Sequence, residues 1–195
     1  MNAMTVLGQG LTAAYNHEDA LSVQEAELSI LRRLGASGLF FAAQTNLANT
    51  YHALGRNEEA LRIRRDVYSG RLKLFGEEHR DTLTAASNYG TSFRLLNRFE
   101  EAKALFRKII PVARRIVGNS NCLTLAMRRN YASALCEDTG ATLDDLREAV
   151  TMLEETDRIA RRVLGGAHPR VMGIEEYLRD VRAVLHARET SSGSA

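Results

Sequence analysis

The chain has 195 residues, and its 26 Lys and Arg nearly balance its 24 Asp and Glu, for a formal net charge of +2. This near balance argues against a dedicated binder of polyanions. The hydrophobic share of 45% and the charged share of 26% are typical of a folded globular chain, which excludes disorder over most of the length. Two prolines, no tryptophan and 6% aromatic residues favour helices over a β-sandwich or barrel.

The apolar runs are short, and the cysteines are few. The longest run, over residues 38–43, is far shorter than the roughly 20 residues that span a bilayer, so we expect no membrane insertion. The first residues lack a basic segment followed by an apolar core, which predicts a cytoplasmic protein without a secretory signal. Cys122 and Cys136 do not form a C-x-x-C pair, and we expect both to be reduced thiols.

The chain repeats itself with a period of 42 residues. A shift by one period places residues 42–83 over 84–125 without a gap, and eleven of the 42 positions are identical. Chance would give about three. A third copy carries an insertion of five residues, and a weaker copy precedes the first two. The sequence therefore predicts a single domain over residues 1–187, with repeats at about 3–41, 42–83, 84–125 and 126–170, a capping helix at 171–187 and a polar flexible tail at 188–195.

Each repeat is expected to contain two helices. In the second repeat, Leu47, Ala48, Tyr51 and Leu54 have the spacing of an amphipathic first helix. The second helix begins with acidic residues, which favour a helix N-terminus. The first helices are expected to end at a left-handed residue, which is Asn16, Gly55 or Asn97. The second helices are expected to be closed by a glycine, which is Gly76, Gly118 or Gly165.

Small residues recur where the two helices of a repeat must approach each other closely. A larger side chain at such a position would cost about 1–3 kcal/mol by overpacking. The expected positions are Ala48, Gly90 and Ala132 in the first helix, and Ala60, Ala102 and Ala149 in the second. Pro111 falls inside a predicted second helix, where we expect a bend and not a break, because the apolar pattern continues beyond it.

The repeat has a recognisable core. It reads Leu47-Ala48-Asn49-Thr50-Tyr51 with Ala60, and Tyr89-Gly90-Thr91-Ser92-Phe93 with Ala102. This pattern resembles the tetratricopeptide signature, whose usual unit has roughly 34 residues. The longer period, together with Leu164-Gly165 two residues before His168-Pro169, resembles the kinesin-light-chain type of repeat. The resemblance covers about residues 3–187 and implies an adaptor that contacts other proteins.

A fold class follows from these patterns. A lone helix pair cannot bury its apolar face, whereas stacked neighbours form one continuous core. We therefore predict an all-α protein, a right-handed α-solenoid of stacked antiparallel helix pairs similar to a tetratricopeptide superhelix, with a C-terminal capping helix.

Motifs for catalysis and for metal or cofactor binding are missing from the sequence. It has no G-x-S-x-G, P-loop, H-E-x-x-H or dinucleotide-binding motif, so we predict a protein that is not an enzyme and takes no cofactor. The five histidines are scattered, whereas a zinc site needs three or four converging ligands. His79 and His168 occupy equivalent loops, where we expect them to pack between helices. Arginines cluster on the second helices, but interleaved carboxylates and the lack of neighbouring aromatic residues disfavour nucleic acid as a partner.

The inner face of such a solenoid, lined by the first helix of each repeat, is the surface that repeat proteins use as a concave groove. Short polar side chains at this face suit the backbone of an extended peptide. The groove candidates are Thr45, Asn46, Asn49, His52, Ser87, Asn88, Thr91, Arg94, Arg129, Asn130 and Ser133.

Three of these candidates, Asn46, Asn88 and Asn130, recur at the interval of 42 residues. They either bridge neighbouring helices, which we favour, or bind ligand amides. The leading hypothesis is a non-enzymatic adaptor that binds a peptide or protein segment in its groove. The alternative is a structural subunit that packs through its ends or its convex face in a larger assembly or a homo-oligomer.

Overall fold

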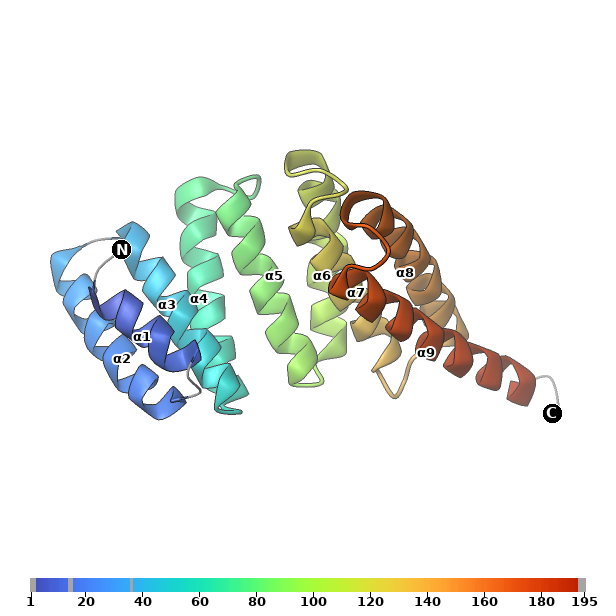
Figure 1. Cartoon of the computed structure of the whole chain (residues 1–195), viewed down its shortest axis with the longest axis horizontal. Coiled ribbons are helices and arrows are strands. Elements are labelled where there is room, and N and C mark those ends of the chain that lie inside the picture. Colours follow the sequence, from blue (N-terminus) through green and yellow to red (C-terminus); the bar gives the residue numbers. More distant parts are fainter. Residues whose placement is uncertain (1–2, 14–15, 36, 193–195) are drawn as a thin grey trace. The chain divides into compact units, whose positions relative to one another are not determined.

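The computed structural model describes residues 3–13, 16–35 and 37–192. Within these ranges the regular elements are all α-helices, which confirms the predicted fold class (Figure 1). In chain order they are α1 (Ala3–Ala13), α2 (His17–Leu34), α3 (Ser37–Ala53), α4 (Asn57–Phe75), α5 (Arg80–Leu95), α6 (Phe99–Ile116), α7 (Cys122–Cys136), α8 (Leu143–Leu164) and α9 (Pro169–Ser192).

The chain packs as two compact units, Met1–Gly76 and Glu77–Ala195. In the first unit, drawn blue to cyan in Figure 1, α1, α2, α3 and α4 each pack against the next helix along the chain. In the second unit, drawn green to red, α5 to α9 do the same, and α5 also contacts α7. Packing between consecutive helices confirms the predicted helix pairs.

The apolar stripes of the helices form the core of each unit. In the first unit Leu21, Leu47 and Tyr51 belong to one buried cluster with Ala60. In the second unit the largest fully buried apolar side chains include Phe106 and Leu146. Burial of such side chains contributes about 1.5–3 kcal/mol each, so the stripes stabilise the packing of successive helices.

The predicted helix ends are mostly confirmed. Gly55 follows α3 with a φ of 75°, and Asn97 follows α5 with a φ of 58°. Asn16 was expected to adopt the same left-handed backbone, and this prediction is wrong, because its φ is −86°. Asn16 lies directly before α2 and is the N-cap of that helix, so its backbone has the conformation of a helix start.

The expected close approaches between helices are also present. All five predicted alanines are at most 1% exposed. At Gly90 in α5, an added Cβ atom would lie 2.7 Å from Cζ of Phe106 in α6. Phe106 is itself fully buried, so its ring has no free space into which it can move. The small residue at this position is what allows α5 and α6 to pack.

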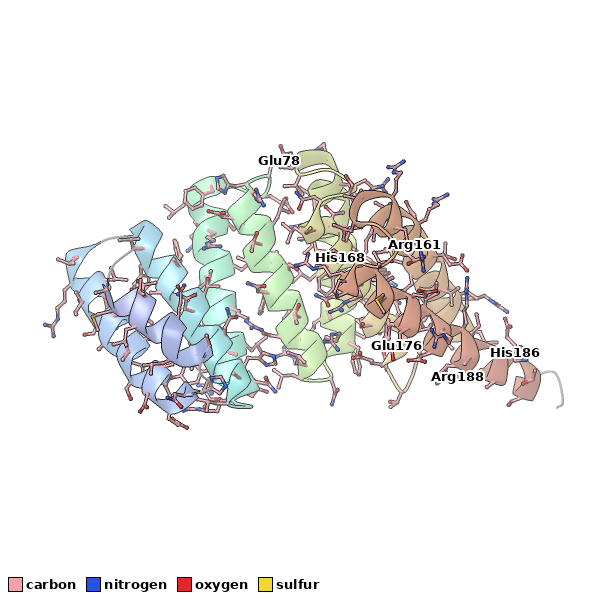
Figure 2. All side chains as sticks on the ribbon, viewed as in Figure 1. Glu78, Arg161, His168, Glu176, His186 and Arg188 are labelled. Atoms are coloured by element: carbon pink, nitrogen blue, oxygen red, sulfur yellow. The ribbon has the colours of Figure 1, made fainter. Side chains whose placement is uncertain are left out.

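One position in the loops between repeats caps the next helix. Nδ1 of His79 accepts a hydrogen bond of 3.1 Å from the backbone N–H of Asp81 at the start of α5. His168, which Figure 2 labels just before α9, accepts in the same way from the N–H of Arg170 at 3.1 Å. Asn121 caps α7 through its Oδ1 atom. These residues therefore satisfy free N–H groups at helix starts, a more specific role than the loop packing expected for the two histidines.

Two further helices differ from a simple repeat. α6 continues past Pro111 to Ile116, as predicted. α9 extends through Ser192, so residues 188–192, which the sequence assigns to a flexible tail, are helical, whereas residues 193–195 lie outside the described ranges. The helix continues because Arg188 donates to the carbonyl of Ala141 at 2.5 Å and Glu189 accepts from Arg147 at 2.9 Å.

Candidate functional site

The candidates of the first unit lie on α3. Thr45 donates to the carbonyl of Phe41 in its own helix, and the ring of His52 contacts Oδ1 of Asn57 at 2.8 Å. Oδ1 of Asn49 accepts from Nη2 of Arg64 in α4 at 3.1 Å. The side chain of Asn46 is half-buried and forms no hydrogen bond with any described residue. The structure therefore brings these candidates onto one helix, but it gives most of them an internal partner.

The candidates of the second unit lie on α5 and α7, which contact each other. Ser87, Asn88, Thr91 and Arg94 come from α5, and Arg129, Asn130 and Ser133 come from α7. Ser87 is 5% exposed and Ser133 is 8% exposed, so neither side chain is presented at the surface. Arg129 is exposed, and the remaining four side chains are half-buried. The surface shared by α5 and α7 thus consists of five of the seven predicted residues.

The three equivalent asparagines do not behave alike. Nδ2 of Asn130 donates to Oγ1 of Thr91 at 3.0 Å, which links α7 to α5. Thr91 in turn donates to the carbonyl of Ser87. Asn88, like Asn46, has no hydrogen-bond partner among the described residues. Asn130 therefore bridges helices, while Asn46 and Asn88 keep their donors and acceptors unused.

Arg94 is held by the insertion in the third repeat. Its Nη1 atom lies 2.9 Å and 2.7 Å from the two carboxylate oxygens of Glu137, which directly follows α7. This pairing was not predicted, because the sequence shows only that the third repeat carries an insertion. The only available signal was the cluster of carboxylates that the insertion adds to a nearly neutral chain. As a result, the charge of Arg94 is neutralised by a partner within the chain.

The same insertion is fastened to α6. Nζ of Lys103, which is 4% exposed, donates to Asp138 at 3.1 Å. Burial on its own would lower the pKa of Lys103, but its bonds to Glu100 and Asp138 outweigh this effect, and the pKa is raised. The backbone N–H of Gly140 and the Lys103 ammonium lower the pKa of Asp138. This pair of a buried ammonium and a half-buried carboxylate holds the loop against α6.

A pocket of about 280 Å³ lies in the first unit, beside α1, α2 and α3. Asn46 and Asn49 line it together with Gln24, which is 2% exposed. Oε1 of Gln24 is buried and has no hydrogen-bond partner among the described residues. The pocket is therefore rich in amide groups, which pair readily with a peptide backbone.

A second pocket, of about 360 Å³, lies in the second unit among α7, α8 and α9. Leu125 and Ile174 form part of its apolar lining, and Arg129 and Arg170 also line it. Of these residues, the sequence reasoning had singled out Arg129 alone. Arg170 and Ile174 could not be placed from the sequence, because their relation to α7 depends on how α9 packs.

Within the described ranges, no three His, Cys, Asp or Glu side chains converge as metal ligands do. The helices in these ranges are also too short or too polar to cross a membrane.

Comparison with known proteins identifies the repeat. The tetratricopeptide repeat family matches residues 39–115. Tetratricopeptide repeats generally mediate contacts between proteins, and proteins built from them are typically non-enzymatic scaffolds. The search of curated proteins gave no match.

Solved structures with the same fold cover almost the whole chain. BtubC (BKLC) from P. vanneervenii is 16% identical, with 96% of this chain and 74% of that chain covered and a TM-score of 0.75. A protein from P. anserina described as a putative kinesin light chain with nearly identical TPR-like repeats is 17% identical, with 99% of this chain and 96% of that chain covered and a TM-score of 0.72. These similarities show that the fold is that of kinesin-light-chain-like tetratricopeptide repeats.

Proposed function

We propose that this chain, which carries tetratricopeptide repeats over residues 39–115 and has the fold of kinesin-light-chain-like repeat proteins, is a non-enzymatic adaptor. Each compact unit binds an extended peptide segment of another protein on the surface formed by the first helices of its own repeats. In the first unit this surface belongs to α3, and in the second unit it belongs to α5 and α7.

The observation that carries this proposal is the unused hydrogen-bonding capacity of Asn46 and Asn88. Both amides occupy the same position in successive repeats, and neither is bonded to a described residue. Both amides are half-buried and remain open to water, and a peptide backbone offers donors and acceptors that can replace that water. The pocket beside Asn46 supplies further amide groups for the same purpose.

A peptide selection tests the proposal. Random peptides displayed on phage are selected on the immobilised full chain, and the affinity of a selected peptide is measured by fluorescence anisotropy. The double variant Asn46→Ala and Asn88→Ala is expected to bind the peptide at least about tenfold more weakly, because it loses bonds to the backbone of the ligand. Circular dichroism checks that the variant keeps its helices.

The matched control changes two exposed side chains on second helices, Arg62 in α4 and Arg114 in α6. Arg114 has no partner among the described residues, and Arg62 has only a coulombic interaction with Glu59 within α4, so the variant Arg62→Ala and Arg114→Ala is expected to bind the peptide as well as the unchanged chain. Equal loss in the two double variants, or no loss in the asparagine variant, contradicts binding on the first helices.

The alternative, a structural subunit of a larger assembly or a homo-oligomer, is favoured by one observation. Large apolar side chains are exposed at equivalent positions near the ends of three second helices: Leu74, Ile116 and Val163. Sedimentation velocity over a range of concentrations tests self-assembly. A concentration-dependent increase in mass that is abolished by Ile116→Glu supports the alternative, and a constant monomer mass contradicts the homo-oligomer.

A further inference from the structure

The pocket of about 360 Å³ that Arg129 and Arg170 line lies where α7 and α9 begin and α8 ends. Its apolar walls come from all three helices, with Leu123 and Leu125 from α7, Leu164 from α8 and Ile174 from α9. Ala126 and Ala160 leave the space open, because their side chains are too short to fill it. The pocket measures about 360 Å³, which lies at the lower end of the roughly 300–1,000 Å³ of pockets that hold small molecules.

Two arginines give this apolar pocket a positive charge that no side chain lining it offsets. Arg129 and Arg170 both line it, and neither forms an ion pair or a hydrogen bond through its guanidinium with any described residue. The residues of the lining include no Asp or Glu. Two neighbouring arginines of this unit are, by contrast, paired, since Arg161 contacts Asp157 at 2.7 Å and Arg182 contacts Glu154 at 2.6 Å.

The helix geometry adds to this charge. Cys122 is the first residue of α7, and Arg170 is the second residue of α9, so two helix N-termini lie at the pocket. A helix N-terminus carries a partial positive charge that favours anions. One helix C-terminus, that of α8, opposes them with a partial negative charge. The two guanidinium groups and the two helix N-termini together outweigh the single C-terminus of α8, so the pocket is electropositive.

We propose that this pocket binds a small organic anion, a carboxylate attached to an apolar body. The apolar body packs against Leu125 and Ile174, and the carboxylate accepts hydrogen bonds from Arg129 and Arg170. Arginine suits this task because its planar guanidinium donates two parallel bonds to a carboxylate. The site lies wholly within the second unit, and it does not depend on peptide binding at the asparagines.

Cys122 provides a direct probe of occupancy. Its side chain is exposed and lines the pocket, so a bound ligand shields the thiol from an alkylating reagent. The experiment uses the full chain with Cys136→Ala, which leaves one thiol, and measures the rate of its reaction with N-ethylmaleimide. The probe ligand is naphthalene-2-carboxylate, and naphthalene-2-carboxamide is the neutral control of the same shape.

We expect the carboxylate to slow alkylation in a saturable manner and the carboxamide to require at least about a tenfold higher concentration. Arg129→Gln and Arg170→Gln, each introduced alone, are expected to weaken the protection by the carboxylate about tenfold. Arg62→Gln in the first unit removes the same charge from an exposed site and is expected to leave the protection unchanged. The fluorescence of the naphthalene ring gives a second readout, because the chain has no tryptophan.

Three outcomes would overturn the proposal. These are no saturable protection by the carboxylate, equal protection by the carboxamide, and equal effects of Arg62→Gln and the two pocket variants. The variant Asn46→Ala and Asn88→Ala is expected to bind the naphthalene carboxylate normally. A failure of the anion site and a failure of peptide binding are therefore distinguished by different substitutions.

Discussion

The guanidinium carbon of Arg98 lies 4.8 Å from the centroid of the Phe93 ring. One repeat earlier, Arg56 lies 4.5 Å from the centroid of the Tyr51 ring. Each arginine also bonds through Nε to a glutamate three residues further along the chain, at 2.7 Å for Arg98 and 2.9 Å for Arg56. The end of a first helix and the start of the next helix are thus joined by one cation that contacts both.

Replacement of this cation weakens the turn between α5 and α6. Arg98→Met keeps the apolar stem and removes the charge, so we expect the free energy of unfolding to decrease by about 0.5–1 kcal/mol, the usual size of an exposed cation–π contact. Urea unfolding followed by circular dichroism measures the change. Arg114→Met in α6 is the control, because Arg114 has no partner among the described residues. Equal stability of the two variants would contradict a role for the aromatic contact.

Gly90→Ala tests the close approach of α5 and α6. The added methyl group would meet the buried ring of Phe106, and we expect a loss of about 1–3 kcal/mol by overpacking. The higher helix propensity of alanine offsets up to about 1 kcal/mol of this loss. Gly173→Ala in α9 is the matched control, since its Cβ atom would meet no other atom within 4 Å, and this variant is expected to be neutral or more stable. Thermal unfolding compares the two.

The clash has a specific rescue. Phe106→Leu shortens the side chain that Gly90 faces, although it is itself destabilising because it removes buried apolar volume. In the double variant, Gly90→Ala is expected to cost less than it does alone. Additive costs would mean that the two residues do not meet in the folded protein.

The capping role of His168 can be tested by replacing it with asparagine, the residue type that caps α7. His168→Asn keeps an acceptor for the N–H of Arg170, so the free energy of unfolding is expected to stay nearly constant. His168→Ala removes the acceptor and is expected to cost about 1 kcal/mol. Urea unfolding of the two variants side by side decides the matter. The same loss in both would show that the bond to the backbone contributes nothing.

The loop inserted after α7 makes stability depend on pH. The Gly140 N–H and Lys103 lower the pKa of Asp138, and the hydroxyl and N–H of Thr142 lower the pKa of Asp145. A carboxyl whose pKa is lower in the folded state stabilises the fold above its ordinary pKa, and this stability is lost as the pH falls through the folded value. Thermal stability is therefore expected to be level down to about pH 4 and to decrease below it.

Removal of the two carboxylates separates this effect from general acid unfolding. Asp138→Asn with Asp145→Asn is expected to be less stable at neutral pH and to lose less stability on acidification. Asp180→Asn, at an exposed position of α9, is expected to leave the slope as it is. An unchanged slope in the double variant would rule out the loop as the source.

The two thiols are expected to react at very different rates. Burial raises the pKa of Cys136 to about 12, whereas Cys122 is exposed at the start of α7. Because the thiolate is the reactive form, N-ethylmaleimide at about pH 7.5 is expected to modify Cys122 first and Cys136 only slowly. Mass spectrometry of peptides taken at intervals measures both rates, and denaturant is expected to equalise them. Fast modification of both thiols in the folded protein would contradict the burial of Cys136.

The sequence was informative wherever a feature is local and repeated. The period, the apolar stripes and the small residues at Gly90 and Ala102 predicted the helix pairs, because helix packing imposes them at fixed spacing. Asn16 misled the prediction, since one residue type suits both the end of a helix and the start of the next. The helical residues of α9 beyond Ala187 were missed because contacts with Ala141 and Arg147 hold them.

The candidate site was less predictable for a related reason. The groove positions follow from the first helices, but the partner of Arg94 comes from the inserted segment, which lies outside the repeat pattern. Glu137 accepts a hydrogen bond from Arg94. The insertion that begins at Glu137 has no counterpart in the other repeats, so their sequences could not predict this contact. The pocket beside Arg129 arises only when α9 packs against α8 and brings Arg170 to it. Side chains that meet through tertiary packing leave no periodic signal.

The position that precedes each new repeat has a wider consequence. His79 and His168 are histidines and Asn121 is an asparagine, yet each places one acceptor atom over the backbone N–H two residues further along the chain. A histidine ring nitrogen and an asparagine amide oxygen therefore serve the same purpose at this junction. Repeats of this kind can be joined in engineered arrays through either residue, because what the next helix needs is an acceptor for its free N–H.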